Sequence, residues 1–224
     1  MKNKIPTHKI GAESEAISKI ILDNVELAKI HFEIVKKRFL DINSWELFAG
    51  KNKAKFTLRN QKGELILDLP QVGNYISIRV PLLLNKDEDH FDWVKIEVYE
   101  EEKKEDYEAI YIRLRPTSNP TNPSDEVTHF LDSTATSNFF IRRDGREISA
   151  EVYARNEVPN FEDKTLSEKI RNKAVALGGM LIGSKLQWEG LTDGLIKFLL
   201  VVLVFQKDLG KVFSTPRIYL PVNI

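Results

Sequence analysis

Between Asn43 and Tyr153, apolar and polar residues alternate with a period of two. Successive side chains of a β-strand point to opposite faces, so this alternation indicates strands with one face buried and the other wet or differently covered. We therefore predict a sheet of about seven or eight antiparallel strands, and the charged stretch 100–106 is typical of a solvated hairpin loop. The segments that carry the pattern are 54–60, 64–69, 75–80, 93–99, 109–115 and the two arms of 137–153.

One hairpin has a specific turn signal. Asp144-Gly145 is a preferred two-residue hairpin loop, because glycine adopts a positive φ without steric cost. With these two residues as the loop, Arg142 lies opposite Glu147, which is a favourable cross-strand pair. The same register predicts one apolar face, formed by Phe139, Ile141, Ile148, Ala150 and Val152.

Helical spacing begins close to the N-terminus. From Glu13 to Phe39 apolar residues recur every three or four positions, and the charged residues fall mostly elsewhere on the helical wheel. We predict one helix over this range, roughly 40 Å long at about 1.5 Å per residue, although Asn24 interrupts the apolar stripe. A second set of apolar residues widens the stripe, so this helix is expected to contact more than one neighbour.

A second helix is predicted towards the C-terminus. Thr165 and Glu168 form a capping box, in which each side chain satisfies a free backbone donor of the first turn. Apolar residues then continue at helical spacing as far as Trp188. Three glycines weaken the helix and favour a kink or a close approach to the sheet: Gly178, Gly179 and Gly183.

The last thirty residues differ from the rest in composition. Leu195–Phe205 is almost wholly apolar, but it is shorter than the roughly 20 residues that a membrane helix needs. Its β-branched content favours a buried strand that pairs with residues 211–222, and an interfacial membrane anchor is the less favoured alternative. Whether this tail belongs to the folded domain stays open. We divide the chain into an N-terminal extension at 1–12, a single domain at 13–195 and an apolar tail at 196–224.

These elements predict an α+β fold, in which a long N-terminal helix and a C-terminal helix pack on a curved antiparallel sheet. The order resembles that of helix-grip ligand-binding domains, where a C-terminal helix closes a cavity over the sheet. The resemblance is one of architecture alone and no diagnostic motif accompanies it, so it implies a fold but no particular function.

Charge and composition argue against several classes of function. Acidic and basic residues balance at 33 each, whereas nucleic-acid-binding proteins usually carry a basic excess, so we predict no nucleic-acid partner. The chain has no cysteine, which excludes disulfides, iron–sulfur clusters and thiolate zinc sites. The N-terminus is positively charged but has no continuous apolar run, so no secretory signal is recognised and a cytoplasmic location is expected.

Two stretches resemble ion-binding motifs and fail in detail. Four acids and a histidine crowd into Asp87–Asp92, but a calcium-binding loop beginning at Asp87 would have Phe91 where an oxygen ligand is required and Val98 in place of the final glutamate. We predict a solvated turn there, and neither a metal nor another cofactor. The glycine-rich stretch Gly178–Lys185 lacks the Gly-Lys-Ser/Thr order of a phosphate-binding loop, so helix packing is the favoured explanation.

Polar residues at the predicted strand ends form the remaining candidate site. If the sheet brings them together, His129 with Asp132 or Glu157 would suit acid–base chemistry, and the arginines would hold an anion. No nucleophile and base are fixed relative to each other, so loop capping is favoured and no catalytic residue is assigned. The residues assigned to ligand binding are Arg113, Arg115, His129, Tyr153, Arg155, Asn156, Glu157 and Trp188.

Two hypotheses about function follow. In the first, the protein is a non-catalytic domain that holds an apolar small molecule between sheet and helix, as its aromatic residues suggest. The alternative is a protein–protein interaction or assembly module, or a homo-oligomer, that uses the N-terminal helix and the apolar tail. The two differ in whether the widened apolar stripe of the N-terminal helix finds partners within one chain. An enzyme is the third choice, and a membrane partner is disfavoured.

Overall fold

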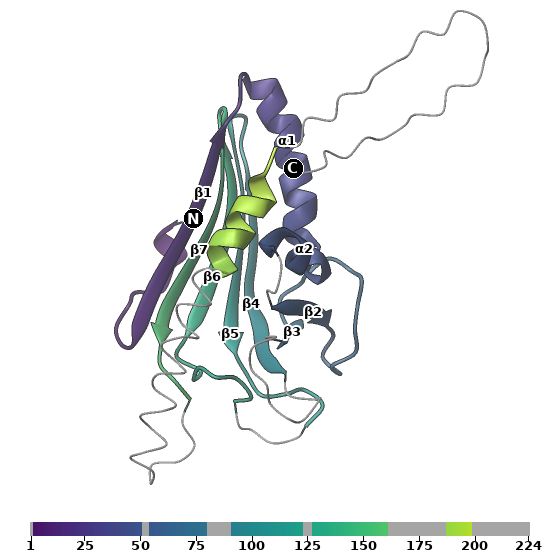
Figure 1. The fold of residues 1–224 in the computed structure, drawn as a ribbon, viewed down its shortest axis with the longest axis vertical. Helices are drawn as coiled ribbons and strands as arrows, with labels where there is room; N and C mark the ends of the chain where they lie inside the picture. The colour runs from purple at the N-terminus through teal and green to yellow at the C-terminus, as the bar shows by residue number, and fades with distance from the viewer. Residues whose placement is uncertain (1, 51–53, 80–90, 123–126, 161–186, 199–224) are drawn as a thin grey trace, which may run out of the picture.

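The structure of the chain is a computed structural model, and it describes residues 2–50, 54–79, 91–122, 127–160 and 187–198. These residues form a seven-stranded antiparallel sheet with the strand order β1-β7-β6-β5-β4-β3-β2 (Figure 1). The strands are β1 (Ala12–Ile21), β2 (Lys55–Arg59), β3 (Tyr75–Arg79), β4 (Asp92–Lys103), β5 (Tyr107–Pro116), β6 (Thr136–Asp144) and β7 (Glu147–Glu157). The predicted α+β fold with a curved antiparallel sheet is therefore confirmed.

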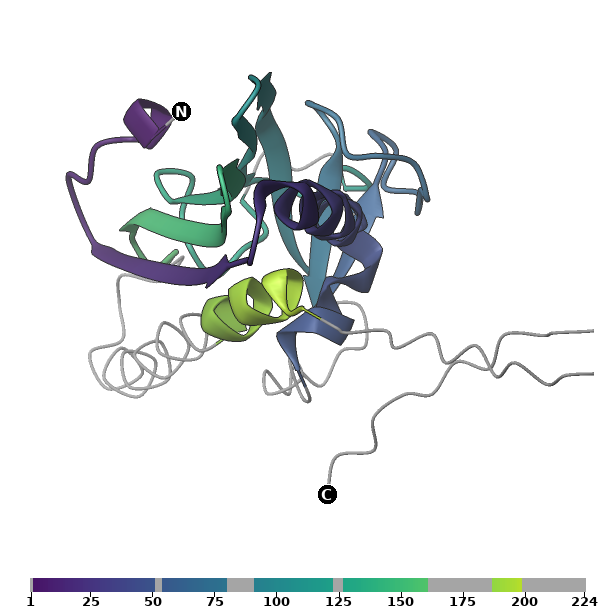
Figure 2. The same cartoon turned by 90° about the horizontal axis from the view of Figure 1, so that it is seen from above.

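The helices pack on one face of this sheet, which we call the inner face. They are α1 (Val25–Leu40), α2 (Trp45–Ala49) and a helix over residues 187–196, and their buried side chains share one hydrophobic core with the strands. The 3-10 turn η2 (Ile42–Ser44) joins α1 to α2, whereas η1 (Lys2–Lys4) lies across the opposite, outer face (Figure 2). The outer face carries a second, smaller cluster formed by Tyr111, Phe140 and Tyr153. Both faces of the central strands are therefore covered.

The N-terminal helix is shorter than predicted. Residues assigned to its first turns form β1, which pairs with β7 from Ala12 to Ile21. The apolar residues of β1 are spaced so that they also fit a helical stripe, and the pairing with β7 decides between the two structures. Asn24, which interrupts the stripe, is the N-cap of α1, because its side-chain oxygen accepts the backbone N–H of Leu27 at 2.8 Å.

The predicted β6–β7 hairpin forms, but its two-residue loop lies one residue further along the chain, which shifts the pairing of the two strands by two residues. Asp144 pairs with Glu147, so the loop is Gly145-Arg146 rather than Asp144-Gly145. Gly145 has φ +54, and this fits a turn that places glycine at its first central position. Arg142 consequently lies opposite Ser149, and its ion pair is with Glu151 instead of Glu147.

Two other strand predictions need correction. The segment 64–69 is not a strand: it makes a single antiparallel bridge, between Leu65 and Arg59 of β2. The expected loop at 100–106 is mostly strand, since β4 continues to Lys103.

The start of the apolar tail is helical, not a strand, because Leu195 and Ile196 end the helix over 187–196 and are buried in the core. Within the part of the chain that the structure describes, no helix combines the length and hydropathy needed to cross a membrane. The predicted features outside the described residues are the capping box at 165–168, the glycines at 178–183, the acidic stretch at 87–90 and the rest of the tail from 199 to 224. The proposed domain boundaries stay a prediction.

Candidate ligand-binding site

An aromatic layer fills the space between the inner face of the sheet and the helices. Trp45 of α2 is fully buried, with its ring centroid 5.5 Å from that of Phe56 on β2 and 5.1 Å from that of Phe139 on β6. Its indole N–H donates to the backbone oxygen of Phe39 at 2.9 Å, so its polar atom is satisfied. This part of the layer is closed to a ligand.

Trp188 continues the same layer and is only half-buried. Its ring centroid lies 5.2 Å from that of Phe139, edge to face, and 6.0 Å from that of Phe56. Thr192 follows one turn later on the same side of the helix, and its hydroxyl is 2.9 Å from that of Ser18 on β1. The described helix thus presents an aromatic ring and a hydroxyl group towards the sheet.

Two glycines set the distance between this helix and α2. A Cβ atom at Gly194 would lie 2.0 Å from the carbonyl oxygen of Phe48, and one at Gly190 would lie 2.5 Å from that of Ala49. Only a residue without a side chain permits this approach. The kink or close approach to the sheet predicted for Gly178, Gly179 and Gly183 lies outside the described residues, and the approach of Gly190 and Gly194 is to α2.

The C-terminal end of the helix is bound to α1. Arg38 donates from Nη1 to the carbonyl oxygens of Leu195 at 2.9 Å and Lys197 at 2.8 Å. His31, which is buried, donates from Nε2 to the carbonyl oxygen of Ile196 at 2.8 Å. These bonds satisfy carbonyls that have no partner within the helix, and the guanidinium charge suits the negative end of the helix dipole. Trp188 is therefore held on a helix with a fixed position.

The predicted site residues do not converge. Trp188 lies on the inner face, whereas Tyr153, Arg113, Arg115 and Arg155 lie on the outer face. There, three neighbouring strands repeat one pattern, an aromatic residue followed two positions later by an arginine. The guanidinium groups lie over the rings at 5.8 Å for Arg113–Tyr111, 5.2 Å for Arg142–Phe140 and 5.5 Å for Arg155–Tyr153. Long side chains thus shield the outer aromatic cluster from water.

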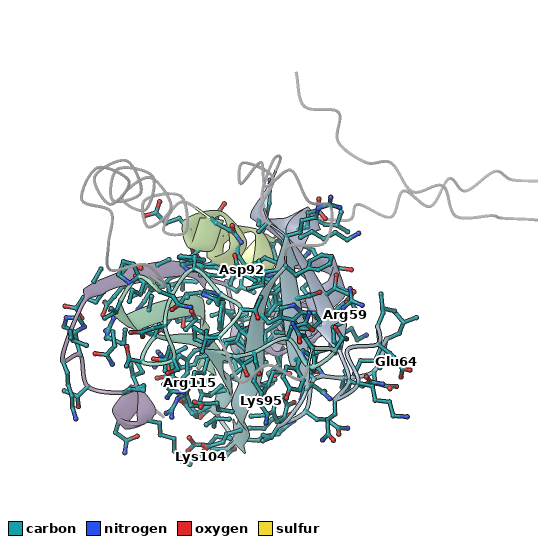
Figure 3. All side chains as sticks on the ribbon, turned by 90° about the horizontal axis from the view of Figure 1, so that it is seen from below. Arg59, Glu64, Asp92, Lys95, Lys104 and Arg115 are labelled. Carbon is teal, nitrogen blue, oxygen red and sulfur yellow. The ribbon has the colours of Figure 1, made fainter. Side chains whose placement is uncertain are left out.

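The outer-face arginines also have acidic or carbonyl partners. Arg142 and the hydroxyl of Tyr153 both donate to the carboxylate of Glu151, and Arg155 pairs with Glu15. Arg113 donates to the backbone oxygen of Lys4 at 2.5 Å, which ties the N-terminal segment to this face. Arg115, labelled in Figure 3, lies on the same face. It donates to Glu97 and to the backbone oxygen of Ser133. An anion would have to displace these partners.

Asn156 and Glu157 anchor the N-terminal segment. Asn156 has φ +56, and its side-chain oxygen accepts the backbone N–H of Lys9 at 2.7 Å and that of Ile10 at 3.3 Å. Gly11 passes so close that a Cβ there would lie 2.5 Å from the backbone oxygen of Glu157. Burial raises the pKa of the Glu157 carboxyl to about 7.

His129 lies in the segment before β6 and is not placed for catalysis. Its Nδ1 accepts the backbone N–H of Leu131 at 2.9 Å, and burial lowers its pKa to about 3, so the ring is neutral over the physiological range. Asp132, its predicted partner, instead accepts the backbone N–H of Thr134 at 2.8 Å.

Asp92, which was expected in a solvated turn, is the first residue of β4. Burial raises the pKa of its carboxyl to about 6, and this carboxyl accepts the backbone N–H of Phe130.

A cleft of about 710 Å³ lies between α1 and the β4–β5 hairpin. Its lining is rich in charged side chains, and Arg143 in it is fully buried. The guanidinium of Arg143 donates to Glu108 and to the backbone oxygens of Asp106 and Gly145, so it organises the two hairpin turns. Ile30 is the apolar side chain in this lining. The cleft is a poor match for an apolar ligand.

The sequence matches no family model and no curated protein. Among solved structures, a hypothetical protein from Helicobacter pylori is 14% identical, with a TM-score of 0.40 over 80% of this chain and 86% of that one. A putative uncharacterized protein from Bacillus thuringiensis is 13% identical, with a TM-score of 0.36 over 83% of this chain and 100% of that one. Norcoclaurine synthase from Thalictrum flavum is 8% identical, with a TM-score of 0.32 over 76% and 87%. Similarities at this level carry no argument about function.

Proposed function

We propose that this chain is a non-catalytic domain that binds an apolar small molecule between Trp188 and the inner face of the sheet. The observation that carries the proposal is the half-buried side chain of Trp188, whose ring lies beside the buried rings of Phe56 and Phe139 at the end of the aromatic layer. Small-molecule sites are concave and mostly apolar, with a few polar groups that orient the ligand. The Ser18–Thr192 hydroxyl pair supplies such groups beside an aromatic wall.

Nuclear magnetic resonance on ¹⁵N-labelled protein tests the site directly. The chain has three tryptophans, so it gives three indole N–H signals, which the single variants Trp188→Phe and Trp93→Phe assign. Trp93 serves as the control for binding elsewhere on the protein. It precedes the inner-face residue Val94 on β4, so its side chain points to the outer face, away from the proposed site.

The probe is anilinonaphthalene sulfonate, an aromatic compound that fluoresces when it enters an apolar site. We expect saturable movement of the Trp188 indole signal while the Trp93 signal stays in place. Equal movement of both signals, or none at saturating probe, would contradict the proposal. A native mass spectrum of untagged protein provides an independent check, because a retained apolar compound would appear as added mass.

An assembly module is the second candidate, and α1 provides the observation that favours it. The helix buries Ala28, Phe32 and Val35 against the sheet but leaves Ile30 and Ile34 exposed, so its widened apolar stripe is only half satisfied by the described residues. The double variant Ile30→Ser/Ile34→Ser tests this role by sedimentation velocity. Loss of an oligomer in the variant would support assembly through α1, whereas a wild-type monomer would contradict it.

A further inference from the structure

The segment that follows β2 exposes an unusual amount of apolar surface. Four large side chains within eight residues are mostly in solvent: Leu65 is 55% exposed, Leu67 84%, Leu69 62% and Val72 59%. We call these four residues the leucine ridge. Single exposed apolar side chains are common on protein surfaces, but a contiguous group of this kind marks an interaction site.

The ridge lies at the edge of the sheet, where backbone groups are available for pairing. β2 is the last strand in the sheet order, and the ridge segment covers part of its free edge. The backbone N–H of Ile66 donates to the oxygen of Leu58, and that of Asn60 donates to the oxygen of Glu64. In this antiparallel bridge the N–H and C=O of Leu65 therefore point away from β2, towards the outside of the molecule.

Asn43, in the turn η2, holds the ridge segment against β2 through its side chain. Its side-chain oxygen accepts the N–H of Leu58 at 2.8 Å, and its side-chain nitrogen donates to the oxygen of Ile66 at 3.0 Å. Ile66 itself packs against the hydrophobic core. The segment is thus anchored by alternate residues, and the leucines of the ridge are presented on a supported backbone.

The charged residues of the ridge segment itself are both acidic. Glu64 and Asp68 are exposed within the ridge segment, and no basic residue occurs between Lys62 and Arg79. Figure 3 shows Glu64 at the periphery of the molecule, with Arg59 of β2 as the labelled basic residue beside it; the guanidinium of Arg59 is already bonded to the backbone oxygen of Gly63 at 3.1 Å. An apolar ridge with acidic residues is complementary to a partner that is apolar and basic.

We propose that the leucine ridge binds an extended segment of another protein in which basic and apolar residues alternate, and that this segment pairs with the outward backbone groups of Leu65 as an added strand. Strand addition uses backbone hydrogen bonds for affinity and alternate side chains for specificity. A second copy of this chain fits less well, because it would bring the Glu64 and Asp68 carboxylates of both copies into one interface. A membrane with anionic lipids would be repelled by the same carboxylates.

The test uses the full chain and a fluorescein-labelled peptide of alternating lysine and valine, with fluorescence polarisation as the readout. Two control peptides accompany it: one has glutamate in place of lysine, and the other has an N-methylated central valine that cannot donate a backbone hydrogen bond. We expect the lysine peptide to bind, with affinity that falls as salt rises, and both controls to bind at least about tenfold more weakly.

The variants Leu67→Ser and Asp68→Asn should each weaken this binding, by about tenfold for the leucine. Both residues are exposed, so neither change should affect folding. Leu47→Ser is the matched control, because Leu47 is a 78% exposed leucine outside the ridge, on α2.

Three results would overturn the proposal. Equal binding of the lysine and glutamate peptides, or no binding of either, would exclude a basic partner. A dimer in sedimentation experiments that Leu67→Ser abolishes would show that a second copy occupies the ridge. Co-flotation with neutral phosphatidylcholine vesicles, lost in Leu67→Ser, would identify a lipid surface instead.

Discussion

Replacement of Gly194 by alanine separates two opposing effects in the helix over 187–196. In an exposed helix, Gly→Ala stabilises by about 1 kcal/mol, because alanine has the higher helix propensity. Here the new methyl group would lie 2.0 Å from the carbonyl oxygen of Phe48, whereas ordinary contact begins at 3.4 Å. The helix and α2 must therefore separate by about 1.4 Å. That movement draws the buried side chains of Leu191 and Leu195 out of the core.

Overpacking of this kind costs about 1–3 kcal/mol, and the oxygen atom belongs to backbone that cannot rotate away. Partial loss of apolar contact adds to this cost, so we expect Gly194→Ala to lower the free energy of unfolding by about 2 kcal/mol after the gain in propensity. Urea denaturation measures it. Asp193→Ala, at an exposed position of the same helix, is the control and should be neutral or slightly stabilising. A Gly194→Ala variant as stable as the wild type would refute the close approach to α2 and with it the fixed position of Trp188.

Three further predictions concern residues that contact the N-terminal segment or the helix over 187–196. The pKa of Glu157 is raised in the folded state, so the stability that its neutral carboxyl contributes is present below about pH 4.5 and is lost as pH rises through about 7. Glu157→Gln, which stays neutral, should therefore be about 3 kcal/mol more stable than the wild type above pH 7 and equal to it in acid. Urea denaturation at each pH measures the difference. Asn156→Gly keeps the positive φ but loses the bonds to the N-terminal segment, so limited proteolysis should cut that segment faster; Asn156→Ala should in addition lose about 1 kcal/mol of stability. Arg38→Met removes the bonds to the end of the helix over 187–196, so it should lower the free energy of unfolding by about 1–2 kcal/mol in urea denaturation. It should also shift the fluorescence emission of Trp188 to longer wavelength, and an unchanged emission would mean that Arg38 does not hold the helix.

The fold class was predictable because the strand signal is local. β3, β4 and β5 follow alternating segments whose inward side chains are isoleucine, valine and leucine, and no long-range information was needed to recognise them. β1 was missed because Ile17, Ile20 and Ile21 fit a helix as well as a strand, and only the pairing with β7 decides between them. The hairpin loop was predicted one residue too early because Gly145 can occupy either central position of a two-residue turn.

The candidate site was less predictable, because it depends on which elements meet across the core. Trp188 was identified from its place at the end of a helical pattern, but its contacts Phe56 and Phe139 belong to strands far away in the sequence. Ser18 was hidden inside a stretch assigned to a helix. Gly190 and Gly194 had a readable signal: they are four residues apart in a helix, which places both on the side that meets α2.

The arginines at the strand ends illustrate why a polar cluster in a sequence need not be a site. Arg113, Arg142 and Arg155 each lie two residues after an aromatic residue, so strand periodicity alone puts each guanidinium on the same face as the preceding ring. On that face each arginine already has a partner, and the rings beneath are buried. A ligand that used them would have to break ion pairs and expose aromatic surface. A ligand at Trp188 requires neither, because that side chain is only half-buried and has no ion pair to break, and this difference is why we place the site on the helical side of the sheet.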